Sequence, residues 1–175
     1  MSDALKKYYE IKCDEARYRV INHPLRRGLK AIRAWEHRYE GYPIYSGSAF
    51  GGLHDLAYGI YYDMGFIKEW WQHQLSIAIN VAHITNISGV LHLDCAFGRW
   101  FMEKRGLSYS QETETDLCFE TAIISGDFFS HYAPDIPRDI FLHHDAAPYD
   151  AFLYNPASQQ FEPFPVPLIP KPQLA

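Results

Sequence analysis

The chain has 175 residues, which fits one domain and is long enough to bury a core without disulfide or metal staples. Hydrophobic residues make up 47% and aromatic residues 16% of the sequence, so an intrinsically disordered chain is excluded. The formal net charge is -5, and basic residues gather only at Arg26, Arg27 and positions 30–33, which disfavours duplex nucleic acid as a partner.

Cysteine usage and the N-terminal residues predict the compartment. Cys13, Cys95 and Cys118 are widely spaced and form no Cys-x-x-Cys pair, which argues against a disulfide framework and a thiolate zinc site. Polar residues follow Met1, and no apolar run approaches the length of a membrane span. We therefore expect a soluble protein of the reducing cytoplasm with no membrane association.

The N-terminal half is predicted to be helical. Residues 3–20 place apolar side chains among charges in the pattern of a modest helix. His23-Pro24 breaks this pattern, and apolar residues at three- and four-residue steps then predict an amphipathic helix over 25–39.

The next segment combines turn residues with a long apolar stretch. Residues 41–52 are rich in Gly and Ser and are predicted to form a loop over a concave site, although 42–45 could pair briefly as a strand. Residues 53–62 fit both helical and strand periods. Apolar side chains cover well over half the circumference of a helix over 66–82, which predicts that this helix is buried on most sides.

A central strand is predicted from Gly89 to Phe97. Alternate side chains of an extended chain share a face, so His92 and Asp94 point to one side. The opposite side is wholly apolar, from Leu91 onward, which suits a strand against a core.

The rest of the chain is predicted to be rich in strands. We expect a short helix or strand extension over 99–105 and an exposed polar loop over 108–116. Four further segments have the length and apolar content of strands: 117–125, 128–132, 139–143 and 151–154.

These elements predict an α+β fold, with a helical N-terminal half packed on a mainly antiparallel sheet formed by the C-terminal half. Residues 1–162 are expected to form a single globular domain. Residues 163–175 form a proline-rich tail, in which proline alternates with apolar residues and favours a polyproline-like conformation outside the sheet interior.

His92-Leu93-Asp94 presents an imidazole and a carboxylate on one predicted strand face. Completed by a distant histidine, this spacing resembles the facial triad of the iron(II) and 2-oxoglutarate dioxygenases. The resemblance implies Fe(II) bound by His92, Asp94 and His143, with His131 as the other choice of third ligand. The simpler interpretation is a half-buried histidine that hydrogen-bonds its neighbour, since His-x-Asp is a common tripeptide.

His54-Asp55 is similar to the metal-binding doublet of the HD-type phosphohydrolases, which have a nearly all-helical core. The alternative is a helix start, with Asp55 favoured by the dipole at the helix N-terminus. The strands predicted for the second half favour this alternative.

Three segments resemble the ADP-ribosyltransferase fold of the PARP and diphtheria-toxin type. Gly59-Ile60-Tyr61-Tyr62 is similar to the strand in which that family places a tyrosine after a glycine. Residues 91–100 resemble the core strand that follows, and residues 150–155 resemble the strand that bears the catalytic acid.

The transferase resemblance implies NAD as the cofactor. His23 and Tyr61 would hold NAD, and Asp150, in place of the family's glutamate, would hydrogen-bond the ribose as an oxocarbenium-like centre develops. Three further residues are assigned to NAD binding: Ser46, Ser48 and Tyr62.

The leading functional expectation is nevertheless non-enzymatic. A small acidic domain that is rich in Tyr and Trp and ends in a proline-rich tail is typical of a protein-binding or inhibitory module. Aromatic side chains provide large contact areas at low entropic cost and concentrate at interface hot spots. We therefore expect another protein as the partner, with NAD or Fe(II) involved only if one of the enzymatic hypotheses holds.

Overall fold

The structure is a computed structural model that describes residues 7–13, 44–49, 51–143 and 150–165. The elements of these residues are, in chain order, β1 (Tyr8–Cys13), β2 (Ile44–Ala49), α3 (Leu53–Tyr61), α4 (Gly65–Asn80), β3 (Asn86–His92), α5 (Ala96–Lys104), α6 (Gln111–Tyr132), β4 (Arg138–His143), β5 (Asp150–Asn155) and β6 (Gln160–Pro165). The strands form one sheet in the order β2-β1-β3-β4-β5-β6.

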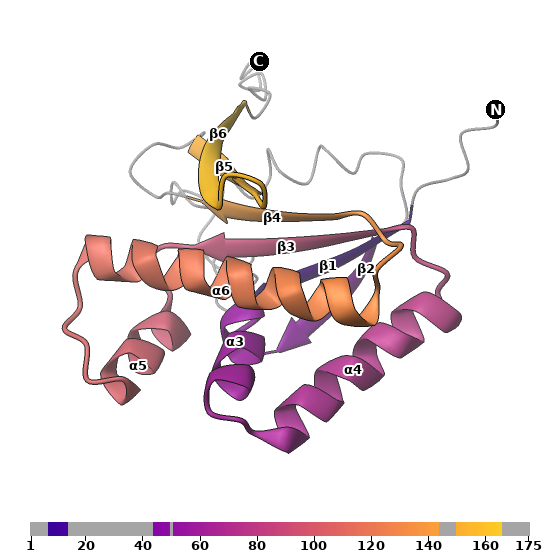
Figure 1. The fold of residues 1–175 in the computed structure, drawn as a ribbon, viewed down its shortest axis with the longest axis horizontal. Helices are drawn as coiled ribbons and strands as arrows, with labels where there is room; N and C mark the ends of the chain where they lie inside the picture. Colours follow the sequence, from indigo (N-terminus) through magenta and orange to yellow (C-terminus); the bar gives the residue numbers. More distant parts are fainter. Residues whose placement is uncertain (1–6, 14–43, 50, 144–149, 166–175) are drawn as a thin grey trace, which may run out of the picture.

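The sheet is mixed. β2, β1, β3 and β4 run parallel, while β5 and β6 are added in antiparallel directions. The connections from β2 to β3 and from β3 to β4 cross the sheet in the same direction, so right-handed crossovers place both on one face. Figure 1 shows α3, α4, α5 and α6 together on one side of the sheet.

The predicted α+β class is confirmed. Helices α3 and α4 belong to the first half of the chain, and β4, β5 and β6 to its C-terminal part. The sheet differs from the mainly antiparallel, C-terminal sheet of the prediction, because β1 and β2 come from the N-terminal half and pair in parallel. The connections from β2 to β3 and from β3 to β4 contain helices, which return the chain to the same end of the sheet and allow parallel pairing.

β3 is the central strand of the parallel part. β1 pairs with one of its edges and β4 with the other. The side chains from Ile87 to His92 are buried, as expected of a parallel strand covered on both faces. Ile87 and Leu91 belong to the main core, whereas Val90 packs against Phe141 on the opposite face.

The extended conformation predicted through position 97 ends at His92. Asp94 has a φ of 63°, in the left-handed region, and α5 begins at Ala96. Alternation of side chains holds only while the chain is extended. The prediction that His92 and Asp94 share one strand face is therefore wrong.

α6 occupies a segment predicted as a loop followed by two strands. The Ser110 hydroxyl accepts a hydrogen bond from the Thr113 N–H, and the Thr113 hydroxyl accepts one from the Ser110 N–H, which closes a capping box. The strands predicted over 117–125 and 128–132 are wrong, because short apolar runs rich in Ile, Thr and Phe fit both periods.

The helix predicted over 3–20 is wrong for the part that the structure describes. This part is β1, in which Tyr9 and Ile11 face the main core. The intervening Glu10 and Lys12 form an ion pair, with Lys12 Nζ 2.8 Å from the Glu10 carboxylate. The two charged side chains neutralise each other, which allows them to lie in a mostly buried strand.

The segment predicted as the loop 41–52 contains β2. Gly52, with a φ of 56°, comes directly before α3. Residues 53–62, whose pattern fits both a helix and a strand, are therefore helical as far as Tyr61. The amphipathic helix predicted over 25–39 lies outside the described residues.

α4 confirms the helix predicted over 66–82 but not its burial. Trp71, Leu75 and Ala78 are buried, while the opposite face of the helix is exposed. α4 packs on α3 and lies at the outer edge of the helical layer (Figure 1).

β6 continues past the predicted domain boundary at residue 162. It pairs with β5 as far as Pro165 and forms the edge of the sheet, where proline is tolerated because its missing N–H faces solvent. Residues 166–175 of the predicted tail lie outside the described part. Within the described part, no helix is long and apolar enough to cross a membrane.

Close packing of α3 on α4 depends on Gly59. A Cβ added there would lie 2.4 Å from Ile67 Cγ2 and 2.7 Å from Ile67 Cβ, so alanine must push α4 away. We expect Gly59→Ala to lower the free energy of unfolding by about 1–3 kcal/mol in urea denaturation.

Gly126 in α6 provides the matched control, because nothing lies within 4 Å of a Cβ added there. Alanine is a better helix former than glycine by up to about 1 kcal/mol, so Gly126→Ala should raise the free energy of unfolding. Equal effects of the two substitutions would contradict the close packing of α3 on α4.

Candidate functional site

The carboxyl end of β3 is where this topology would place a ligand. In open α/β sheets, ligands bind beyond the carboxyl ends of strands, at the point where successive connections leave in opposite directions. Here β1 leads to β2 on one side, and β3 leads to β4 on the other. His92, one of the predicted iron ligands, is the last residue of β3 and lies at this end.

His92 is turned into the protein. Its side chain is 7% exposed, and Nδ1 donates a hydrogen bond to the Leu93 carbonyl oxygen at 2.9 Å. His143 is its register partner on β4, although the side chain of His143 lies outside the described part. His131 lies at the C-terminal end of α6, near the start of β4 and therefore at the opposite end of the sheet.

Asp94, the predicted carboxylate ligand, pairs with another group. Its carboxylate forms an ion pair with the Arg99 guanidinium of α5, and about half of each side chain is exposed. Among the described residues, no group of three or more His, Cys, Asp or Glu side chains is placed to hold a metal ion. The described geometry therefore provides no iron triad around Asp94.

Glu114 ties α6 to the turn after β3. Its side chain is fully buried, and Oε1 accepts a hydrogen bond from the Cys95 N–H at 2.9 Å. The Tyr109 hydroxyl donates to Oε2 at 3.4 Å. Burial raises the pKa of the Glu114 carboxyl, while the bond from Cys95 and the nearby His92 and Arg99 oppose this rise. This carboxylate is an internal acceptor that holds the turn in place.

His54 and Cys118 form a buried pair. His54 is 1% exposed, its Nδ1 lies 2.8 Å from Thr121 Oγ1, and its Nε2 lies 3.9 Å from Cys118 Sγ. Burial and the nearby His92 imidazole lower the pKa of His54 to about 3. Burial also raises the pKa of the Cys118 thiol well above its usual range, so this thiol is not an activated nucleophile.

Sequence reasoning missed the pairing of His54 with Cys118. The two residues are far apart in the sequence, and no spacing rule connects the start of one helix with the middle of another. The HD-type hypothesis is not supported by these contacts, because the His54 imidazole bonds within the core while Asp55 accepts a hydrogen bond from Trp71 Nε1 at 3.1 Å.

Tyr61 and Tyr62, both assigned to the transferase hypothesis, lie at the C-terminal end of α3 and not in a strand. The Arg105 guanidinium lies over the Tyr61 ring, 4.5 Å from its centroid. The Tyr62 hydroxyl donates a hydrogen bond to the Lys104 carbonyl oxygen at 3.2 Å. Both tyrosines therefore join α3 to α5.

The other residues assigned to NAD are distributed across the sheet. Ser46 and Ser48 lie in β2, and Asp150 begins β5. β2 and β5 are separated by four strand spacings, or roughly 19 Å. His23 lies outside the described residues. The described residues that are assigned to NAD do not come together in one site. The transferase assignment therefore stays a prediction.

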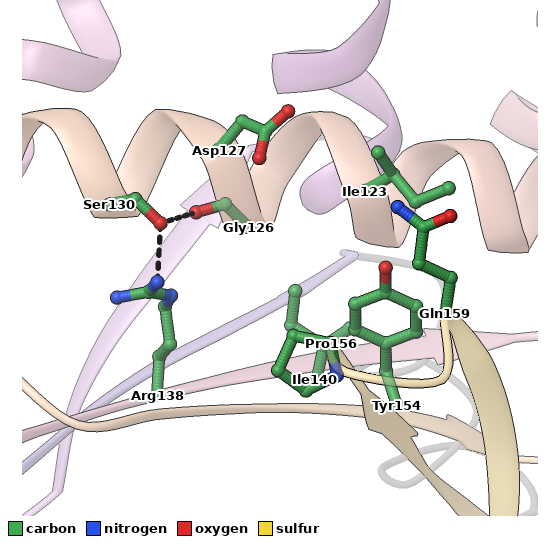
Figure 2. Close-up of a pocket in the computed structure, with 9 residues that line it drawn as sticks. All are labelled: Ile123, Gly126, Asp127, Ser130, Arg138, Ile140, Tyr154, Pro156 and Gln159. Atoms are coloured by element: carbon green, nitrogen blue, oxygen red, sulfur yellow. Dashed lines mark hydrogen bonds between the residues drawn. The ribbon is translucent and has the colours of Figure 1, made fainter.

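A polar recess lies between α6 and the β5–β6 hairpin (Figure 2). It has a volume of about 140 Å³, space for a few water molecules. Figure 2 shows Arg138 turned toward Ser130, whose hydroxyl donates to the Gly126 carbonyl oxygen at 2.8 Å. Arg138 begins β4, so the recess lies at the amino end of that strand, away from the carboxyl ends that this topology favours for ligands.

The outer face of α4 exposes several large apolar side chains. Four large side chains on this face are exposed by 67%, 40%, 41% and 72%, in the order Phe66, Trp70, Ile77 and Val81. We call these four residues the α4 stripe. Their spacing places Phe66, Trp70 and Ile77 on one side of the helix, away from the buried residues, and Val81, the C-cap residue, continues this side.

The α4 stripe begins at an apolar hollow. Phe66, Ile67 and Trp70 line this hollow with Asp55, and its volume is about 350 Å³. No Lys, Arg, Asp or Glu occurs in α4 after Glu69. Depletion of charge around exposed aromatic and aliphatic side chains is typical of the centre of a protein interface.

The role of Glu114 in holding the turn after β3 can be tested. Glu114→Ala leaves the buried Cys95 N–H without its acceptor and should lower the free energy of unfolding by about 1–3 kcal/mol. Glu114→Gln keeps an acceptor oxygen and should be milder. The exposed Glu103→Ala is the control, and a loss equal to that of Glu114→Ala would contradict this role.

Burial of neutral His54 should make stability depend on pH. The pKa of a histidine in the unfolded chain is ~6.5, whereas the pKa of His54 in the folded protein is about 3. Between these two pH values the unfolded state binds one proton that the folded state does not bind. The contribution of neutral His54 to the free energy of unfolding is fully present above pH ~6.5. Below that pH it falls by about 1.4 kcal/mol per pH unit.

Urea denaturation of His54→Gln at neutral pH and near pH 5 measures this contribution. On acidification, the free energy of unfolding of the variant should fall by about 2 kcal/mol less than that of the wild-type protein. His131→Gln, which changes an exposed histidine, should keep the wild-type pH dependence. The assignment to His54 fails if both variants lose the same free energy.

Comparison with known proteins assigns no family to the chain. No protein-family model matches the sequence, and no curated protein or solved structure is significantly similar to it.

Proposed function

We propose that this chain is a protein-binding module and that the α4 stripe is its interface. The observation that carries the proposal is the exposure of Phe66, Trp70, Ile77 and Val81 on one face of a helix that has no Lys, Arg, Asp or Glu after Glu69. Single exposed apolar residues are ordinary, but several large apolar side chains grouped on one helix face beside a hollow are a feature of binding surfaces.

The physical chemistry of the α4 stripe favours association. Burial of apolar surface contributes about 25 cal/mol per Å². Trp70 lies against Trp71, with ring centroids 5.0 Å apart, and Trp71 is fixed by its bond to Asp55. A tryptophan held in this way loses little conformational freedom on binding, which is a property of hot-spot residues.

The groups on which the enzymatic hypotheses depend support them less well. His54 is enclosed and lies within hydrogen-bond distance of Thr121, while His92 is buried and bonded to the Leu93 carbonyl oxygen. Asp94 is paired with Arg99, and Tyr61 lies under Arg105. The Fe(II) and NAD hypotheses remain predictions that no described cluster of side chains favours.

Site-specific photocrosslinking tests the proposal and requires no candidate partner. A benzophenone amino acid introduced at Ile77 in the native organism should give covalent protein adducts, because this position would lie inside the interface. The same photocrosslinker at Glu112, an exposed residue in the first turn of α6, is the matched control.

The expected result is adduct formation at Ile77 and little at Glu112. Mass spectrometry of the adduct then identifies the partner. Equal labelling at the two positions, or no adduct at Ile77 and none at Phe66, would overturn the assignment of the α4 stripe as an interface.

A further inference from the structure

We propose that the partner at the α4 stripe is a second copy of this chain, bound through an antiparallel pair of α4 helices around a twofold axis. This inference rests on the proposed function, because it names the partner of the same surface. Twofold contacts between identical chains require a surface that is complementary to itself.

The spacing of the α4 stripe meets this requirement. The midpoint between Phe66 and Val81 coincides with the midpoint between Trp70 and Ile77. Each residue of a helix advances by about 1.5 Å, so an antiparallel pair centred there brings each Phe66 opposite Val81 of the other copy. Each Trp70 then lies opposite Ile77 of the other copy.

The shapes of the two ends also match. One end has two large aromatic side chains and the hollow lined by Phe66, Ile67 and Trp70. The other end has the smaller Ile77 and Val81, the latter 72% exposed. Antiparallel packing therefore inserts an aliphatic side chain beside each hollow, whereas parallel packing would oppose aromatic to aromatic residues and leave the aliphatic end poorly filled.

The centre of the α4 stripe is polar. His73 and Gln74 flank the midpoint, and an imidazole and an amide can each donate and accept a hydrogen bond. A polar pair at the centre of an apolar seam specifies register. No Lys, Arg, Asp or Glu lies between Trp70 and Asn80, so no like charges meet across the axis.

The exposed area indicates the strength of this dimer. The four side chains of the α4 stripe expose roughly 400 Å² per copy, taking about 150–250 Å² for each fully exposed residue. Two copies bury roughly twice that area, near the lower limit of specific interfaces at about 1,000 Å² once polar neighbours are included. An interface of this size belongs to weak, reversible complexes. We therefore expect a dissociation constant on the order of micromolar or weaker, although area alone does not fix affinity.

Sedimentation equilibrium of the purified full chain measures the association. We expect the mass to rise with concentration from 20.3 kDa toward twice that value. Ile77→Asp should raise the dissociation constant by about 100-fold, because each dimer contains the substitution twice. Leu107→Asp, at an exposed apolar position outside the α4 stripe, is the control and should dimerise like the wild-type protein.

Disulfide trapping tests the antiparallel geometry. A mixture of Trp70→Cys and Ile77→Cys proteins, distinguished by a tag, should oxidise to the mixed species in preference to either species linked to itself. The wild-type chain reports the background from its native cysteines, of which Cys95 and Cys118 are buried. Preferential linkage of Trp70→Cys to itself would indicate parallel pairing and overturn the antiparallel dimer.

The outcomes separate this inference from the proposed function. A monomer at concentrations well above micromolar, together with adducts of Ile77 to a different protein, overturns the dimer and retains the binding module. A dimer that Ile77→Asp and Leu107→Asp weaken equally also overturns the inference. The absence of both dimer and adducts overturns the two proposals together.

Discussion

The pairing of β3 with β1 on one edge and β4 on the other is the constraint on which the rest of the structure depends. A strand bonded on both edges and covered on both faces is largely apolar, and β3 fixes the plane on which the helices pack. The end of β3 at His92 then determines where the chain turns into α5. Glu114 secures that turn from the neighbouring helix, so the position of α6 is coupled to the length of β3.

Sequence reasoning locates α4, β4 and β5 and the second half of β3, because each has the length and apolar content of its element and turn residues near its ends. It fails for β1, where Glu10 and Lys12 neutralise each other within a strand, because a charged residue beside apolar ones is read from the sequence as exposed. It also fails for α6, where Ile, Thr and Phe suit a strand locally and only the long helical register, begun by the cap at Ser110, decides the outcome. Parallel pairing is not visible in any single segment, since it depends on where the crossovers lead.

The site could be predicted only in part. Adjacent polar residues such as His92 and Asp94 attract attention in a sequence, yet the positive φ of Asp94 separates them. The contacts that occupy His54, by contrast, come from α6 and leave no signal in the spacing. For α4 the apolar residues are evident from the sequence, but a helix that is apolar on two sides does not reveal which side meets the sheet. That choice decides whether Trp70 belongs to a core or to a surface.

The prolines of β6 limit how this fold can assemble. β6 is the last strand of the sheet, and Pro163 and Pro165 each remove a backbone donor from it. An edge with missing donors is a poor template for strand addition, the route by which exposed edges lead to fibrous aggregates. The β6 edge of the sheet should therefore resist sheet-to-sheet polymerisation, although the same protein displays apolar side chains on α4.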